Sequence, residues 1–312
     1  MARRESNIRV SIVVPHLGDD SAFESSLISV LENRPPDCEV WVAHDGNYND
    51  PFDLGDEVRF VTHKTRTLPA LVGAAADVVH GRFVHVIAGG IRATDGWVEA
   101  ALEKYEHPDA AIVAPVARRQ LGGLITAAGW TSSPARLTTP IAHGKQALAR
   151  RDPASIRGVC LAASFWRREE LRSATRAFVT DSAAAAQFAW SRLLCRQGWR
   201  CILADQSNVL ADEAMLGLCP SLHQGLSLRS LESEIKNQSM TGSAISVGIA
   251  AVSNLLRPRY WGEVTGEAIS LVHRSASLRP LQPEMIRAPE DVVATIRLPR
   301  PADITAAVRR AA

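Results

Sequence analysis

Polar side chains that could bind a ligand follow two β-branched runs of the sequence, residues 9–14 and 39–43. The first run is followed by Pro15 and His16, and the second leads to Asp45. In an open α/β sheet the ligand lies outside the carboxyl ends of the strands. If the two runs are neighbouring strands, an imidazole and a carboxylate are expected at that edge, where both can hydrogen-bond to a polar ligand.

A third buried run, residues 83–87, is followed by Ala88, Gly89 and Gly90. Glycine lets the backbone turn sharply or come close to another group. None of these three residues has a side-chain donor for a metal ion. The sequence therefore predicts a strand end that can approach a ligand with its backbone but cannot ligate a cation.

The two polar candidates also have purely structural interpretations. Asp45 precedes Gly46 and can cap a turn. For Asp45 the ligand contact and the turn cap are both left open. For His16 we expect an exposed loop residue, with stacking on a ligand or bonding to it as the alternative.

Alternating strands and helices would position these residues. This order predicts a mainly parallel, doubly wound α/β sheet. Further strands are expected over 58–62, 110–116, 158–166, 201–204 and 209–210, and helices over 22–32, 68–80, 94–105, 167–172 and 182–197. Residues 120–156 show no clear periodicity and are predicted to form a functional or mobile loop region.

The sequence changes character near residue 214. Candidate helices over 222–236, 243–256 and 260–274 precede a proline-rich tail, 280–312. We therefore expect one domain over 1–213 and a helical extension with its tail over 214–312. The uncharged stretch 239–256 is expected to pack on the sheet domain, with a partner or a membrane surface as the alternative.

Composition excludes several classes of protein. The 312 residues are 46% hydrophobic and 22% charged with a formal net charge of +2, which is typical of a globular protein and gives no reason to expect nucleic-acid binding. The five cysteines form no CxxC pair, so neither a disulfide framework nor a zinc site is indicated. No signal peptide or membrane span is predicted. We expect a cytoplasmic protein, with peripheral membrane contact as its one membrane association.

Six motifs follow one another along the chain: VSIVVP, SLISVLEN, EVWVAHDG, RFVHVIAGGIRATDGWVEAAL, GVCLAASFWRREEL and WSRLLCRQGWRCILAD. In this order they resemble a family 2 glycosyltransferase with the GT-A fold. The resemblance covers about residues 8–213.

This resemblance implies a nucleotide-sugar donor and a glycan acceptor. Asp45 matches an acidic residue of the family's base-binding turn and Pro15 matches the end of its first strand, while His16 replaces part of the usual loop. Arg66 could substitute for a missing Arg-Asn pair near the diphosphate, and a solvated surface arginine is the alternative that we favour.

The resemblance also implies a Mg²⁺ or Mn²⁺ ion and a carboxylate base, but the matching positions lack them. The family's Asp-x-Asp motif falls on Ala88-Gly89-Gly90, and its Glu-Asp pair falls on Ala185-Ala186. Asp181 is the nearest carboxylate and the one catalytic candidate, although we expect it to cap the helix that begins near Ser182.

These departures leave two hypotheses. The first is a transferase that passes a sugar from a nucleotide diphosphate to a glycan or cell-envelope acceptor, either without a metal or as a catalytically degenerate member. The second is a pseudoenzyme that binds a glycan or a nucleotide, or acts as a scaffold.

Overall fold

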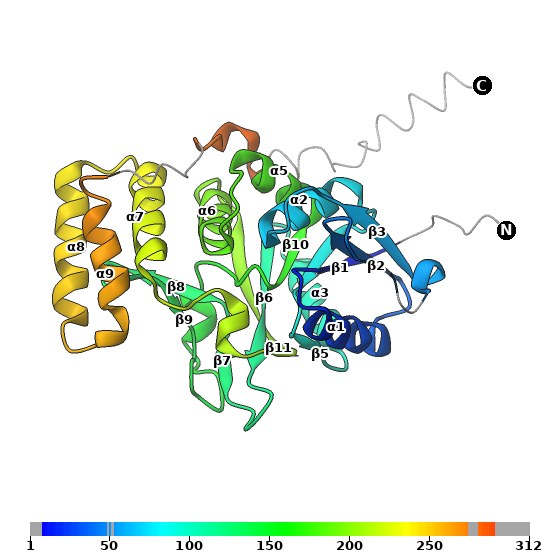
Figure 1. Ribbon diagram of the computed structural model, residues 1–312. Coiled ribbons are helices and arrows are strands. Elements are labelled where there is room, and N and C mark those ends of the chain that lie inside the picture. The colour runs from blue at the N-terminus through cyan, green and yellow to red at the C-terminus, as the bar shows by residue number, and fades with distance from the viewer. Residues whose placement is uncertain (1–7, 49, 51–52, 274–279, 291–312) are drawn as a thin grey trace, which may run out of the picture.

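The structure is a computed structural model that describes residues 8–48, 50, 53–273 and 280–290. Its centre is a nine-stranded sheet in the order β3-β2-β1-β4-β10-β6-β11-β5, with β7 paired to β6 (Figure 1). The strands are β1 (Val10–Pro15), β2 (Cys38–His44), β3 (Val58–Thr62), β4 (Phe83–Ile87), β5 (Arg92–Ala93), β6 (Ala110–Arg118), β7 (Ile125–Ala127), β10 (Ala163–Arg167) and β11 (Arg200–Leu210).

Most neighbouring strands are parallel, as predicted. β1 to β4 form one parallel block, and β6 pairs in parallel with β11. β10 lies between the two blocks and runs antiparallel to both β4 and β6. The two blocks therefore run in the same direction, and the carboxyl ends of β1, β2 and β4 meet at one edge.

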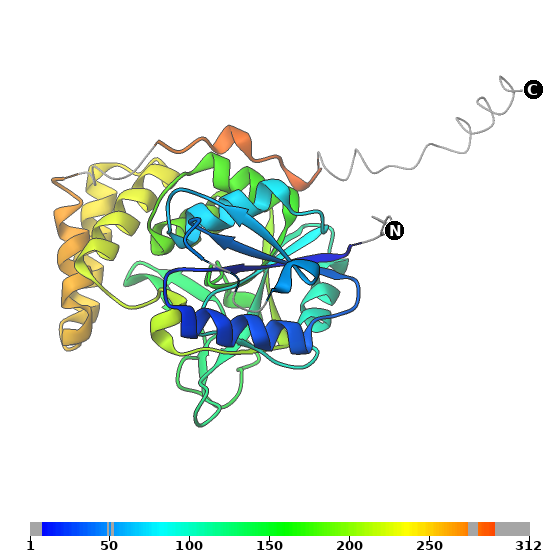
Figure 2. The same ribbon diagram turned by 45° about the vertical axis from the view of Figure 1, so that its right-hand side comes forward.

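Helices cover both faces of the sheet. α2 (Leu68–Val78), α5 (Arg168–Ala177) and α6 (Ala183–Arg196) pack against one another on one face. α1 (Asp20–Asn33) and α3 (Trp97–Leu102) lie on the other (Figure 2). Fully buried tryptophans at 97, 130, 166 and 190 fill the core. Burial of such large side chains is the main stabilising term for the fold.

The prediction of a loop region over 120–156 is wrong for much of its length. β7 pairs with β6, and β8 (Trp130–Ser133) forms a hairpin with β9 (Arg136–Pro140). α4 (Asp152–Ser155) follows. Strands of three to five residues are too short to show a period, and β7 is defined by its pairing with β6 rather than by its own residues. The two strands expected over 201–204 and 209–210 are one strand, β11, because its pairing with β6 continues on both sides of an irregularity between Ala204 and Asn208.

The later helices form a bundle at one end of the molecule (Figure 1). After the short 3₁₀ helix η3 (Glu213–Leu216), α7 (Leu222–Lys236) lies along α6, and α8 (Met240–Asn254) and α9 (Trp261–Ile269) lie farther out. α8 packs mainly on α9 and reaches the sheet domain at the β8–β9 hairpin, where Asn254 contacts Ala135, so the expectation for 239–256 is met at that hairpin and not on the central sheet. Within the described ranges no helix is long and apolar enough to cross a bilayer.

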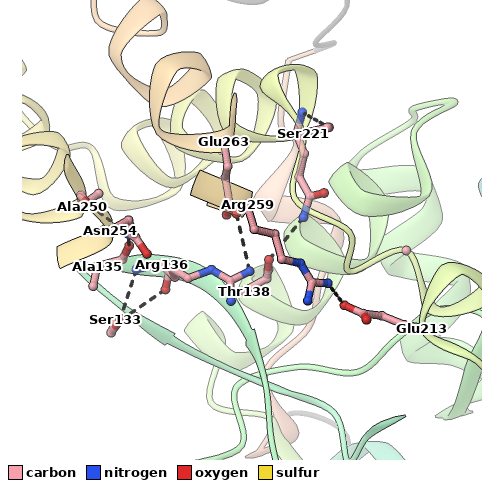
Figure 3. Close-up of polar contacts among 12 residues, drawn as sticks. Ser133, Ala135, Arg136, Thr138, Glu213, Ser221, Ala250, Asn254, Arg259 and Glu263 are labelled. Carbon is pink, nitrogen blue, oxygen red and sulfur yellow. Dashed lines mark hydrogen bonds and ion pairs between the residues drawn. The ribbon is translucent and has the colours of Figure 1, made fainter. Parts of the chain in front are cut away.

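Figure 3 shows three of the polar contacts that attach this bundle to the rest of the chain. Arg136 of β9 forms a buried ion pair with Glu263 of α9, with 3.5 Å between Nη2 and Oε2. Asn254 donates to the Ala135 carbonyl at 3.0 Å, and Arg259 pairs with Glu213 on η3. The bundle therefore holds both the β8–β9 hairpin and η3.

Residues 280–290, which include the 3₁₀ helix η5 (Pro283–Met285), lie along the ends of α5 and α6. Their contacts include Gln282 N to the Ala177 carbonyl at 2.8 Å and Trp199 Nε1 to the Arg287 carbonyl at 2.7 Å. The remainder of the proline-rich tail, 291–312, is outside the described residues.

Candidate functional site

The carboxyl edge of β1, β2 and β4 brings the sequence-predicted residues together. Pro15 pairs with Ala43 across β1 and β2, and the His16 N–H donates to the Ala43 carbonyl at 2.8 Å. The parallel register of β1 with β4 places the turn at 88–90 at the same edge. This edge is the candidate site.

Asp45 holds the turn that follows β2. Its Oδ1 accepts from the Asn47 backbone N–H at 3.0 Å, and its Oδ2 accepts from Asn47 Nδ2 at 3.0 Å. These hydrogen bonds, with the nearby Arg66 cation, hold the pKa of Asp45 below its usual range. The turn-capping interpretation is therefore confirmed, and the ionised carboxylate, whose side chain is 10% exposed, already has partners on both oxygens.

Arg66 joins the ends of β1 and β2. Its Nε lies 3.4 Å from Asp45 Oδ2, and its Cζ would be 3.1 Å from a Cβ built on Gly18 in the loop after β1. The side chain is 45% exposed, so its outer surface faces solvent. The interpretation as a solvated surface arginine is therefore confirmed, and this exposed cation also pairs with Asp45 at the candidate site.

Asp181 reaches the same neighbourhood from another part of the chain. Thr67, adjacent to Arg66, donates its Oγ1 hydrogen to Asp181 Oδ1 at 3.4 Å. The prediction that Asp181 caps α6 is wrong, since the Ser182 hydroxyl accepts from the Ala185 N–H at 3.3 Å. Asp181 is exposed and free of that structural role.

The positions that match the family's Glu-Asp pair are part of the core. Ala185 and Ala186 are 1% and 0% exposed in the first turns of α6. A carboxylate at either position would be buried among apolar side chains, where ionisation is costly. These two side chains lie in the core and are closed to solvent.

His16 is a buried residue and not the exposed loop residue that we expected. It is 3% exposed, with its ring 5.0 Å from Phe23 and 5.1 Å from Tyr48, and Nε2 lies 2.6 Å from Asp20 Oδ1. α1 folds back over the loop and covers the ring, a contact that local sequence does not reveal. As arranged, the ring is not open to stacking on a base, although Nδ1 is buried without a hydrogen-bond partner.

His44 lies beside this aromatic cluster, 6.1 Å from the Tyr48 ring centre. Burial and the neighbouring His16 lower the pKa of His44 below its ordinary value. Its Nδ1 accepts from the Gly46 N–H at 3.2 Å, a contact that a neutral imidazole can make. Sequence reasoning missed Tyr48, which has no periodic or motif signal and becomes significant only through packing.

The turn after β4 is closely packed on both sides. A Cβ on Gly89 would lie 3.3 Å from the Phe23 nitrogen of α1, and a Cβ on Gly90 would lie 2.7 Å from Met215 Cε of η3. Gly90 has φ +85°, a backbone conformation that favours glycine. Met215 was also missed by sequence reasoning, because η3 is 125 positions away from Gly90 and no motif marks it.

This edge does not fit a divalent cation of the Mg²⁺ or Mn²⁺ type. Such ions need several oxygen ligands, commonly carboxylates. Neither glycine offers a side-chain donor, and Met215 covers Gly90 with a thioether. Within the described part of the chain, no three His, Cys, Asp or Glu side chains are placed to hold a metal ion.

No protein-family profile and no curated protein sequence match this chain significantly. Several solved structures do match it in fold. TarS 1-349 from S. aureus is 12% identical with a TM-score of 0.51, and the match covers 81% of this chain and 74% of that one. The same protein in complex with UDP gives 12% identity, a TM-score of 0.50 and the same coverage.

A third match is GalNAc-T7 with UDP, GalNAc and Mn²⁺. It is 11% identical with a TM-score of 0.55, and the match covers 87% of this chain and 56% of that chain. At these identities the likeness concerns the fold alone. The chain has a GT-A-like fold, as the resemblance of its motifs implied.

Proposed function

We propose that this protein is a glycosyltransferase homologue of the family 2 kind that binds a nucleotide-sugar donor at the carboxyl edge of its sheet without a metal ion. The observation that carries the proposal is the convergence of Asp45 and Arg66, 3.4 Å apart, at the edge where GT-A-like folds are expected to bind their donor. The Asp45 carboxylate would accept from the base, and the exposed face of Arg66 would lie near the diphosphate.

Arg66 has a larger part in this proposal than an arginine would have beside a metal. A diphosphate that binds without a cation needs protein cations to offset its charge. Arg66 is held by Asp45 and by the loop at Gly18, so it loses less conformational freedom on binding. Asp181, through Thr67, is the nearest carboxylate that could take a proton from an acceptor hydroxyl.

A second candidate function is non-catalytic nucleotide or glycan binding. The contact between Met215 and Gly90 favours it, because a thioether fills the position at which the related fold would hold its cation. The first candidate predicts nucleotide binding with turnover, whereas the second predicts binding of a nucleotide or a glycan without turnover.

Calorimetric titration with UDP, GDP and their sugars, with and without Mn²⁺, tests the proposal. We expect one nucleotide series to bind and to raise the melting temperature, since a ligand that binds only the folded state stabilises it. Mn²⁺ should leave the affinity unchanged. Asp45→Ala should abolish the nucleotide-induced shift while the protein stays folded, and Asp37→Ala, a carboxylate just before β2, is the matched control.

Two results would contradict the proposal. Binding that requires Mn²⁺ would mean that the cation site forms from residues other than those at 88–90. If none of the nucleotides binds, the proposal of a donor site at this edge is wrong. Release of free sugar or transfer to an acceptor, lost in Asp181→Asn, would separate the transferase from the non-catalytic candidate.

A further inference from the structure

A cleft of about 760 Å³ lies between the sheet domain and the first helix of the C-terminal bundle. It is bounded by the end of α4, the last turn of α6, the start of β11 and the end of α7. β11 runs in the same direction as β4, so the start of β11 lies at the edge opposite to the candidate nucleotide site. We call this space the basic cleft, because five cationic side chains line it: Arg157, Arg192, Arg196, Arg200 and Lys236.

These cations are only partly neutralised. Arg192 Nη2 and Lys236 Nζ share one oxygen of Glu232, at 3.2 and 2.6 Å, and Arg200 lies 3.6 Å from Asp109. Arg157 and Arg196 have no ion-pair partner among the residues that the structure describes. Five cations therefore face two carboxylates, an excess of three charges, whereas the whole chain has a formal net charge of +2.

Helix dipoles explain only part of this concentration. Arg196 and Lys236 lie in the last turns of α6 and α7, where cations are favoured. Arg157 follows α4 in the chain and Arg200 begins β11, and neither position has that reason to be basic. Four separate elements thus contribute positive charge to one concave surface.

A second arginine-rich cleft, of about 700 Å³, lies beside α5. Three of its six lining arginines have ion-pair partners: Arg168 pairs with Glu169, and Arg172 and Arg176 both pair with Asp77. Carboxylates are also part of that lining, whereas the described residues that line the basic cleft include no Asp or Glu.

Of the described buried groups beside the basic cleft, one is a donor without a hydrogen-bond partner, Arg192 Nε. Glu232 Oε2 is also buried without a partner, but it is an acceptor and offers an anion nothing to bind. Burial raises the pKa of the Cys195 and Cys201 thiols, which also line the cleft, so neither supplies a negative charge at neutral pH. The two thiols therefore add no charge that would oppose an anion.

We propose that the basic cleft binds a small anion that carries at least two phosphate groups. Its volume lies within the usual range of ligand sites, about 300–1,000 Å³. Guanidinium groups bind phosphate oxygens through paired N–H donors, which suits a cleft with four arginines and one lysine. The site is distinct from the nucleotide site and does not depend on the function proposed for that edge.

Titration of the full chain with inorganic pyrophosphate at low salt tests this proposal. We expect saturable binding that weakens with added NaCl. The double variant Arg157→Gln/Arg196→Gln removes the two unpaired cations and should weaken binding about tenfold or more. Arg257→Gln is the matched control, since Arg257 is an exposed arginine beyond the far end of α8, roughly 20 Å from Lys236 by the length of the helix.

Asp45→Ala leaves all five cations of the basic cleft in place, so the two proposed sites can fail separately. Failure of the wild type to bind, or equal affinities of the wild type and the double variant, would overturn the proposal. An equal loss in Arg257→Gln would also overturn it, because the binding would then be a general surface effect. If the double variant does not fold, the single variant Arg200→Gln gives the same comparison with a smaller loss.

The same variants show whether the phosphate-bearing ligand of the basic cleft is a nucleotide or another molecule. If UDP still binds to Asp45→Ala and the cleft variant removes that binding, the ligand of the cleft is a nucleotide. If pyrophosphate binds to Asp45→Ala and UDP does not, the cleft takes a phosphate-bearing molecule other than a nucleotide.

Discussion

The Met215 side chain covers Gly90, with 2.7 Å between Met215 Cε and the place where a Cβ of residue 90 would be. This contact joins η3 to the turn after β4, at the position where the resemblance implied a metal motif. Arg259 of the C-terminal bundle pairs with Glu213 and so holds η3 in place (Figure 3). The bundle therefore contributes indirectly to the candidate site.

Gly90→Ala should lower the free energy of unfolding by about 1–3 kcal/mol, because a non-glycine residue at φ +85° is strained. Met215 Cε is the end of a flexible side chain and can move aside, so the steric part of the cost should be small. Chemical denaturation of Gly90→Ala, Met215→Ala and the double variant measures the coupling between them. We expect less than about 1 kcal/mol, and a larger value would mean that the Met215 contact, and not the backbone, dominates.

Arg66→Gln should weaken UDP binding more than uridine binding. The guanidinium is proposed to face the diphosphate, so a ligand without phosphates should lose little. Loss of one charge-assisted contact corresponds to about a tenfold or larger change in affinity. Titrations with UDP and uridine measure both effects, and Arg59→Gln on β3 is the control. Equal losses for the two ligands would place Arg66 at the base instead.

His85 should make the protein less stable as the pH falls below about 6.5. It is fully buried, accepts from Trp97 Nε1 at 3.0 Å through Nε2, and lies 3.0 Å from the Ser164 carbonyl through Nδ1. These contacts assign the neutral tautomer with its proton on Nδ1. Burial lowers the pKa of His85 to about 3, against an ordinary 6.5.

The sign follows from this difference. Between pH 6.5 and 3 the unfolded chain binds a proton at residue 85 that the folded chain does not, so stability is lost as the pH falls. From pH 6.5 to 5 the loss should be about 2 kcal/mol from this group. Denaturation at several pH values measures how the free energy of unfolding changes with pH. This change should be smaller for His85→Gln than for the wild type. His63→Gln, at an exposed histidine, should keep the wild-type slope.

The buried pair between Arg136 and Glu263 should matter more for stability than the exposed pair between Arg259 and Glu213. The side chains of the first pair are 9% and 3% exposed, whereas those of the second are 50% and 26% exposed. Arg136→Ala leaves the Glu263 carboxylate buried and should cost about 3–5 kcal/mol.

Arg259→Ala should cost about 1 kcal/mol or less, since exposed ion pairs contribute little. Urea denaturation of the two variants makes the comparison. Equal costs would show that the bundle is not anchored on the β8–β9 hairpin through Arg136, even though Figure 3 places that pair between them.

The sequence by itself determined most of the sheet. β3 and β4 begin and end at the predicted residues, and β1, β2 and α7 agree closely with the prediction. Their β-branched runs, helical periods and breaking residues are local signals that persist in the fold. The lack of metal ligands at 88–90 could also be predicted, since glycine has no donor in any conformation.

Only the tertiary structure decided how distant residues meet. The β7 pairing, the burial of His16 and the approach of Arg66 to Asp45 depend on segments far apart in the chain. The covering of Gly90 by Met215 and the five cations of the basic cleft have the same origin. Local residue types set which elements form, whereas packing of those elements decides which side chains become neighbours, and no periodicity or motif in one segment encodes its partner in another.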